Sequence, residues 1–221
     1  MGDLELVAFD IETTGFDVDD VVTVAGFRVP LGCRILVQTD GRQPPGLETR
    51  VQKHTDCHVV LSIHEHEREL LDVLAEFVRT RLAEDDILLV AYNGETWNGG
   101  FDLPFLRTRC SAQQLSWPFA NVPYADLYPV FDDLFNTTVD GSASADLETV
   151  YDRCIEGTVG QLDPFADSSE AVRAFEAGEF RDVVLHNIAD IRRTAQLGAL
   201  AQRYCSNADF NVKSLTPASQ G

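Results

Sequence analysis

The sequence has no long apolar run, no paired cysteines and almost no lysine, and each shortage excludes a class of protein. No stretch approaches the ~18 apolar residues that a membrane-spanning helix needs, so we expect no membrane partner. The five cysteines are far apart and form no CxxC pair. The first residues show no basic and apolar leader pattern, so together these features favour a reduced, cytoplasmic protein that is not exported.

Positive charge is also scarce, and the net charge is −19. Affinity for phosphate normally comes from Lys and Arg, so this balance is unusual for a protein that binds nucleic acid. The acids are spread along the whole chain, and lysine occurs only at Lys53 and Lys213. Molar salt shortens the Debye length to about 3 Å and screens the self-repulsion of such an acidic coat. We therefore expect a halophilic source, and we interpret the charge as a property of the solvent and not of the partner.

The chain of 221 residues is long enough for one sizeable core and short for two. We expect a single domain over residues 1–221, with its core at about 4–205. The segment 206–221 ends in "SLTPASQG", which predicts a frayed tail.

Apolar periodicity predicts an α/β fold with a mixed sheet of about five strands flanked by helices. Three strands form an antiparallel meander, and a loop over 40–66 separates them from alternating helices and parallel strands. Strands are expected at 4–11, 21–29, 33–39 and within 85–94, and a strand passing into a helix at 122–135. Helices are expected at 67–82, 101–111, 145–155, 168–179 and 181–205.

The first strand, in "LELVAFDIETTGF", places two carboxylates close together at its end. Asp10 and Glu12 point to the same face and start roughly 6.6 Å apart, because a strand advances roughly 3.3 Å per residue. At an effective dielectric of about 20 they repel by about 2.5 kcal/mol. Either the strand end is solvated, or the pair holds a hard cation such as Mg²⁺ or Mn²⁺.

Three downstream residues bear on this choice, and each also has an ordinary interpretation. Asp102 in "NGGFDLPFL" precedes a helix with Pro104 in its first turn, as a helix cap does. On the last helix, His186 and Asp190 are four residues apart and share a face. Asp190 is also spaced to pair with Arg193 as a surface ion pair.

These motifs occur in a recognisable order: "FDIETTG", then "YNG" followed by "FDLPFL", then HNxxDxxxT. Together they resemble the DEDD superfamily of 3′–5′ exonucleases. The chain looks most like stand-alone proteins related to the proofreading domain of family B DNA polymerases, from about residue 4 to 205. The resemblance implies a ribonuclease H-like fold and hydrolysis of phosphodiester bonds at single-stranded DNA or RNA 3′ ends. Such a role is compatible with DNA repair.

The resemblance also implies the roles of five residues. Asp10, Glu12, Asp102 and Asp190 would hold two divalent ions, Mg²⁺ or Mn²⁺. His186 would be the general base, a role that needs a neutral imidazole with a pKa near or below 6.5. The family uses either a tyrosine in YxxxD or a histidine in HxxxxD, whereas this chain has a histidine at the spacing of the tyrosine.

The second motif departs from the family in its asparagine. Family members have two or three residues between this asparagine and the Phe-Asp pair. Seven residues separate Asn93 from Phe101, whereas Asn98 gives the usual two. We favour Asn93 because it directly follows the predicted buried strand, and Asn98 stays an alternative.

Substrate contacts are expected on both sides of the carboxylates. The resemblance suggests that Thr13 and Thr14 approach the terminal nucleotide. Phe101 or Phe105 would pack against a base, since base stacking works for any sequence. A core position is the alternative for both rings, and it is favoured for Phe101, so Phe105 is the expected base contact.

Two other classes of function compete with the nuclease. The segment "HTDCHVVLSIHEH" suggests a zinc module, although its spacing matches no familiar finger. Its potential ligands are His54, Cys57, His58, His64 and His66. The other class is an inactive exonuclease relative that binds nucleic acid or a replication protein. An endonuclease on the same fold is a further variant of the first hypothesis.

Overall fold

The computed structural model describes residues 4–83, 86–95, 101–138, 141–142, 144–167 and 169–216. Within them a seven-stranded mixed sheet has the strand order β4-β3-β2-β1-β5-β6-β7. The strands are β1 Glu5–Thr13, β2 Val22–Val29, β3 Gly32–Gln38, β4 Val59–His64, β5 Ile87–Ala91, β6 Pro123–Asp126 and β7 Lys213–Ser214. The expected α/β class, with a mixed sheet flanked by helices, is confirmed.

The first three strands form the predicted antiparallel meander. β5 then pairs parallel with β1, and β6 parallel with β5, so the change from antiparallel to parallel pairing is confirmed as well. β4 adds a parallel edge beside β3, and β7 adds an antiparallel edge beside β6. The strand β1 therefore lies in the interior of the sheet, with neighbours on both sides.

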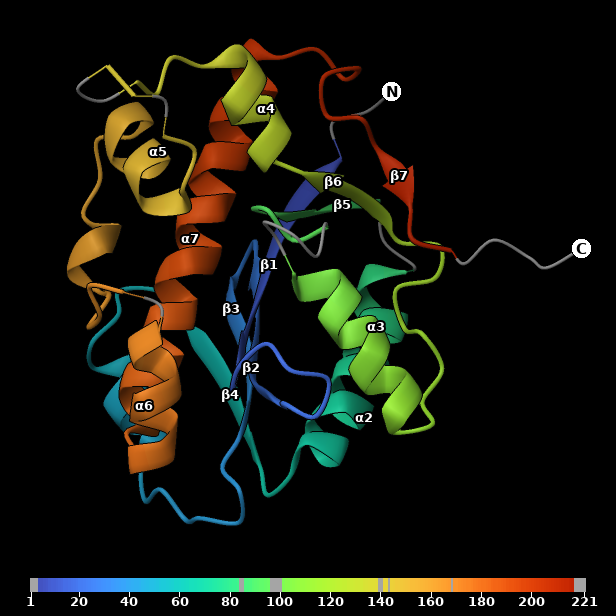
Figure 1. The fold of residues 1–221 in the computed structure, drawn as a ribbon, viewed down its shortest axis with the longest axis vertical. Helices are drawn as coiled ribbons and strands as arrows, with labels where there is room; N and C mark the ends of the chain where they lie inside the picture. The colour runs from blue at the N-terminus through green and yellow to red at the C-terminus, as the bar shows by residue number, and fades with distance from the viewer. Residues whose placement is uncertain are drawn as a thin grey trace, which may run out of the picture.

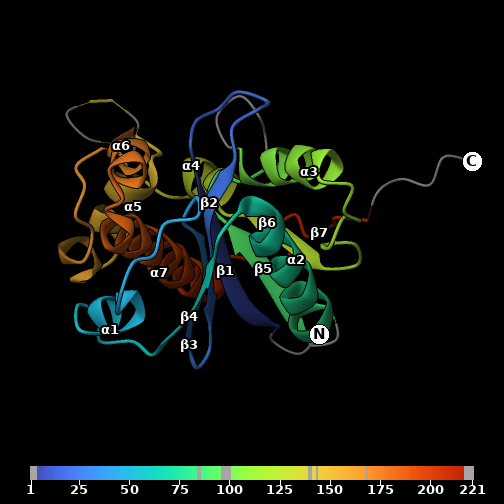
Figure 2. The same cartoon turned by 90° about the horizontal axis from the view of Figure 1, so that it is seen from below.

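Helices cover both faces of this sheet (Figure 2). Helices α1, α5, α6 and α7 lie on one side, and α2 and α3 lie on the other. The long helix α7 runs past β1 (Figure 1). The helices are α1 Leu47–Gln52, α2 Glu67–Phe77, α3 Asp102–Ala112, α4 Tyr128–Leu134, α5 Leu147–Cys154, α6 Ser169–Ala177 and α7 Phe180–Tyr204, with a π-helical turn at Val78–Leu82 and a 3₁₀ turn at Val159–Gln161. No helix in these described segments is both long and apolar enough to cross a membrane.

Side-chain alternation along β1 decides what lies on each side of the sheet. Phe9 and Ile11 are buried in the core cluster formed with α2 and α3. Ala8 is buried in a different cluster, which contains residues of α7. Asp10 and Glu12 share the face of Ala8, so the strand presents both carboxylates to the side that α7 covers.

The described sheet has seven strands and not the expected five or so, and the strands that were not predicted lie at its edges. The expected loop over 40–66 contains α1 and β4, and the segment 206–216 of the expected frayed tail contains β7, whereas 217–221 lie outside the described residues. β4 is half-exposed, so its sequence lacks the continuous apolar run of an interior strand. The tail is held at residues 214–216 by long-range contacts: Trp117 Nε1 donates to the carbonyl of Leu215 at 3.0 Å, and the backbone N–H of Asn121 donates to Thr216 Oγ1 at 2.9 Å.

A buried ion pair joins the meander to α2 and α3. Glu67 Oε2 accepts from Arg109 Nη2 at 2.8 Å, and its other oxygen accepts from Arg109 Nε and from the backbone N–H of Val22, each at 2.9 Å. Arg109 also donates to the carbonyl of Val18 at 2.9 Å. Both side chains are less than a tenth exposed. This pair therefore fixes the turn that follows the carboxylates of β1.

We expect Arg109→Leu to destabilise the protein by about 3–5 kcal/mol, because it leaves the buried Glu67 carboxylate without its counter-charge. Urea unfolding followed by circular dichroism measures the change. The matched control is Arg79→Leu, which removes an exposed pair with Glu76 and should change stability by less than about 1 kcal/mol. Equal effects of the two substitutions would contradict this assignment.

Candidate metal centre

Four carboxylates from three distant segments meet in one pocket. Asp10 and Glu12 come from β1, Asp102 is the first residue of α3, and Asp190 lies in α7. All four line a cavity of about 450 Å³, together with His186. The five residues predicted as the catalytic and metal-binding set are thus brought together by the fold.

Asp102 reaches this cavity from the first turn of α3. Asp102 does not cap α3: the helix begins at this residue, the cap position is Phe101, and no side-chain cap hydrogen bond forms there. Asn93 has a φ of 61° and lines the same cavity. Its backbone N–H donates to Asp126 Oδ1 at 2.7 Å. Asp126, at the end of β6, thereby holds the turn that directly follows β5.

The four carboxyl groups of Asp10, Glu12, Asp102 and Asp190 have raised pKa values because they are buried beside one another. Burial, followed by the charges of Asp102, Glu12 and Asp190, raises the pKa of Asp10 well above its usual range. Burial likewise raises the pKa of Glu12 to about 7 and that of Asp102 well above its usual range. Burial raises the pKa of Asp190 too, although His186 and Arg193 oppose the shift.

The donor set fits a divalent cation. Glu12 is 9 % exposed, and its Oε1 is buried without a hydrogen-bond partner among the described residues. One ligand atom each from Glu12, His186 and Asp190 lies within 4.8 Å of the other two. A buried acceptor that no protein donor satisfies is costly, and a cation removes that cost. Asp10 and Asp102 add further oxygen ligands at the same cavity.

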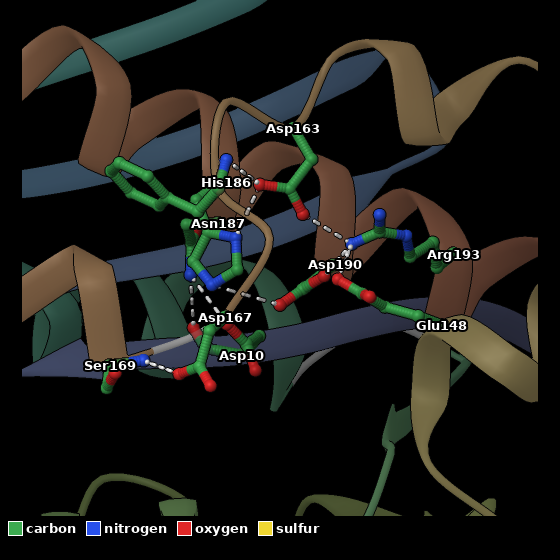
Figure 3. Close-up of polar contacts among 10 residues, drawn as sticks. Asp10, Glu148, Asp163, Asp167, Ser169, His186, Asn187, Asp190 and Arg193 are labelled. Carbon is green, nitrogen blue, oxygen red and sulfur yellow. Dashed lines mark hydrogen bonds and ion pairs between the residues drawn. The ribbon is translucent and has the colours of Figure 1, made fainter.

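His186 is held by a carboxylate on the side away from the cavity (Figure 3). Its Nδ1 lies 2.8 Å from Asp163 Oδ1, and its Nε2 lies 3.7 Å from Asp190 Oδ2. Arg193 Nη1 donates to Asp163 Oδ2 at 2.7 Å and to Asp190 Oδ1 at 2.5 Å. The pairing of Asp190 with Arg193 therefore exists, but it is a buried contact of the site and not a surface ion pair.

The protonation of His186 depends on the carboxylates around it. Burial alone lowers its pKa, but the carboxylates of Glu12, Asp163 and Asp190 outweigh burial and raise the pKa to about 10. Without cations the imidazole is therefore protonated at neutral pH. The expected pKa near or below 6.5 applies to a site with cations bound, and for that state it stays a prediction. Cations bound among the carboxylates would oppose this shift.

Asn187 orients the first carboxylate. Its Nδ2 donates to Asp10 Oδ2 at 2.8 Å and reaches the Asp10 carbonyl at 3.3 Å (Figure 3). Gly26 of β2, opposite Asp10 in the sheet, leaves room for this amide. A Cβ at Gly26 would lie 1.9 Å from Asn187 Oδ1. The glycine and the amide therefore act together to place Asp10.

The expected substrate residues lie at the edge of the cavity or outside it. Phe105 is 2 % exposed, which favours the alternative core position for its ring over a contact with a base. Phe101 lines the cavity instead. Thr13 Oγ1 donates to the carbonyl of Gly15, and Thr14 Oγ1 donates to Asp20, so both hydroxyls serve the turn after β1.

Asn98, the alternative asparagine of the second motif, lies outside the described residues. The potential zinc ligands between His54 and His66 are all described, and they do not converge. In the described part of the chain, the one group of three or more such ligands is Glu12, His186 and Asp190. Cys57 faces Cys33 instead, with 3.4 Å between the two sulfur atoms.

Sequence reasoning missed the residues that support this site. Asp126, Asp163 and Asn187 lie beside the expected motifs, in "YADLYPVF", "DPFAD" and "HNIAD". Asp163 is 23 residues from its partner His186 in the sequence, and Asn187 is 177 residues from its partner Asp10. The one sequence signal for these three residues is that they lie inside segments that resemble the family. No local pattern predicts which residues they contact.

Compared with models of protein families and with curated proteins, the chain matches none of them. The function must therefore be inferred from the geometry and chemistry of this cavity.

We expect Gly26→Ala to lower Mn²⁺ affinity by about 10-fold or more, because the new methyl group displaces Asn187 from Asp10. Titration calorimetry measures the affinity, and circular dichroism checks that the variant is folded. Gly160→Ala is the matched control, since its Cβ would meet only Arg193 Nη2, at 3.9 Å. A folded Gly26→Ala protein with wild-type Mn²⁺ affinity would remove Asn187 from the support of the site.

We expect Mn²⁺ affinity to rise as pH increases from about 6 to 8. The raised pKa values of Asp10, Glu12, Asp102 and His186 mean that protons occupy the metal-free site, and a cation must displace them. Calorimetry in buffers of different ionisation enthalpy reports these protons as a buffer-dependent heat. A heat that does not depend on the buffer, with an affinity independent of pH, would show that these groups are not the ligands.

Proposed function

We propose that this protein is a metal-dependent 3′–5′ exonuclease that hydrolyses single-stranded nucleic acid, with a ribonuclease H-like fold of the DEDD superfamily. One observation carries the proposal: four carboxylates and a histidine, dispersed over the chain in the order of that superfamily, line one cavity. The mixed sheet with its leading meander is compatible with such a fold.

The chain's own residues supply the charge balance that this reaction needs. Two divalent ions, when bound, would activate the attacking water, steady the leaving oxygen and clamp the scissile phosphate. Asp10, Glu12, Asp102 and Asp190 would hold them. Four carboxylates nearly cancel the charge of two dications, so the site can accept the negative charge of the phosphate.

The walls of the cavity suit a nucleotide. Its volume of about 450 Å³ lies in the range of about 300–1,000 Å³ found for small-molecule sites. Phe101 lines it, and the ring of Phe16, which is 69 % exposed, lies 5.0 Å from that of Phe101. Base stacking on such rings is worth about 1–3 kcal/mol per base and is independent of sequence. Tyr92 and Tyr128 form another wall, with ring centroids 6.0 Å apart.

This function also reconciles the acidic composition with a polyanionic substrate. Few lysines and a net charge of −19 give the chain little general affinity for phosphate. Bound cations would supply the attraction at the one place where the reaction occurs. Substrate contact is then concentrated at the 3′ end of the strand and depends on metal.

We expect the protein to shorten a 5′-labelled single-stranded oligonucleotide from its 3′ end in Mn²⁺ and molar KCl. Asp102→Asn should slow the reaction by about 100-fold or more, because it removes a charged metal ligand. Asp133→Asn, on the exposed surface of α4, is the matched control and should leave the rate unchanged. Gel electrophoresis with DNA and RNA versions of the strand resolves each product length.

Each other result of this assay identifies a different function. Internal cuts without a 3′ ladder would indicate an endonuclease. Binding without cleavage, measured by fluorescence anisotropy, would indicate an inactive relative that retains a nucleic-acid surface. Cleavage that is equal in Asp102→Asn and in wild type would exclude this cavity as the active site.

A further inference from the structure

His186 differs from the other residues of the cavity because one edge of its ring is already engaged. The residue is 2 % exposed, and its ring packs edge-on against Phe165 with centroids 5.4 Å apart. Nδ1 is hydrogen-bonded to Asp163 Oδ1 at 2.8 Å. The ring orientation is therefore fixed before any ligand arrives.

The contacts of Asp163 decide which ring nitrogen keeps its proton when the imidazole is neutral. Its Oδ2 accepts from Arg193 Nη1, and its Oδ1 accepts from the backbone N–H of Phe165 at 3.1 Å. A carboxyl group that accepts on both oxygens beside a guanidinium is a carboxylate, which has no proton to donate. Nδ1 of His186 must then be the donor, so the lone pair of the neutral ring is on Nε2.

Nε2 faces the cavity at distances that suit a shared cation better than a hydrogen bond. It lies 3.7 Å from Asp190 Oδ2, beyond the range of about 2.7–3.2 Å for a hydrogen bond. Two ligands at about 2.1–2.2 Å from one ion lie about 3.0 Å apart when adjacent and about 4.3 Å apart when opposite. The ligand atoms of Glu12, His186 and Asp190 all lie within 4.8 Å of one another, close enough for small side-chain shifts to place them around one ion.

A second observation points to a cation at this place. Glu12 is more than nine-tenths buried, and its Oε1 has no hydrogen-bond partner in the described segments. This oxygen belongs to the same group of three residues as Nε2. One metal ion can satisfy both a buried carboxylate oxygen and an imidazole nitrogen of this group.

We propose that Nε2 of His186 binds a transition-metal ion directly, together with Glu12 and Asp190, and that Asp163 is the positioning residue that fixes the imidazole. This inference rests on the proposed function for the existence of a metal site, and it gives His186 the role of a ligand in place of the general base. Carboxylate–histidine–metal arrangements of this kind raise the basicity of the ligand.

The ligand set has a consequence for the choice of metal. Mg²⁺ prefers oxygen ligands and water, whereas imidazole favours first-row transition ions. The site should therefore bind Mn²⁺ in preference to Mg²⁺, and part of that preference should depend on the imidazole. Removal of the imidazole should lower Mn²⁺ affinity more than Mg²⁺ affinity.

Pulsed electron paramagnetic resonance of the Mn²⁺-loaded protein, without nucleic acid, tests the direct bond. We expect the wild type to show the ¹⁴N hyperfine coupling of a bound imidazole, and His186→Gln to lack it. His66→Gln, on an exposed histidine before α2, is the matched control and should keep the signal. A wild-type spectrum without ¹⁴N coupling, or no Mn²⁺ binding at millimolar metal, would overturn the inference.

Calorimetry tests the role of Asp163. His186→Gln and Asp163→Asn should each lower Mn²⁺ affinity by about 10- to 100-fold, with a change of less than about 3-fold for Mg²⁺. Asp163→Asn should retain the ¹⁴N coupling, because the imidazole is still present, and this separates positioning from loss of the ligand. Unchanged Mn²⁺ affinity in both folded variants would contradict the assignment.

The outcomes of this test and of the nuclease assay are distinguishable. Metal-dependent shortening of oligonucleotides without ¹⁴N coupling would overturn the ligand role of His186 and leave the proposed function standing. A ¹⁴N-coupled Mn²⁺ site in a protein that cleaves nothing would overturn the proposed function and support the ligand role.

Discussion

The mutual repulsion of four buried carboxylates is the interaction on which the rest of the site depends. At an effective dielectric of about 20, two carboxylates about 5 Å apart repel by about 3 kcal/mol, and a whole domain is stable by only about 5–15 kcal/mol. Asp10, Glu12, Asp102 and Asp190 can therefore share a cavity only with protons or cations between them. Two observations follow from this constraint: the raised pKa values of the four acids, and Glu12 Oε1, which has no hydrogen-bond partner in the described part of the chain. The same repulsion favours the binding of positive charge among these four acids.

The fold tolerates this arrangement because rigid elements hold each acid. An interior strand carries Asp10 and Glu12. The 25-residue helix α7 carries Asp190 and also the two supporting residues Asn187 and Arg193. Asn187 fixes Asp10, and Arg193 bridges Asp190 to Asp163. Buried polar groups are stabilising only where each has a hydrogen-bond partner. The residues that orient the carboxylates are therefore as important to the site as the carboxylates themselves. The chemistry of the cavity is thus a property of α7 and β1 as a unit.

Local periodicity was enough to predict part of this site. The alternation of β1 placed Asp10 and Glu12 on one face, and the helical spacing placed His186 beside Asp190. The core position of Phe105, the engagement of His186 by Asp163 and the hold of Asn187 on Asp10 depend on contacts between segments far apart in the chain. The two edge strands were not predicted for a related reason: β4 is a short, half-exposed strand, β7 has two residues, and both depend on pairing with a neighbouring strand. The order of the motifs carried information that no single motif held, because it specifies which segments must converge.

Anomalous diffraction from crystals soaked in Mn²⁺ can show whether these four acids and His186 form a metal site. We expect two manganese peaks in the cavity between β1 and α7, both in contact with the carboxylates and one of them with His186 Nε2. A cavity without manganese at saturating Mn²⁺, or peaks confined to the acidic outer surface, would contradict a metal site at these residues.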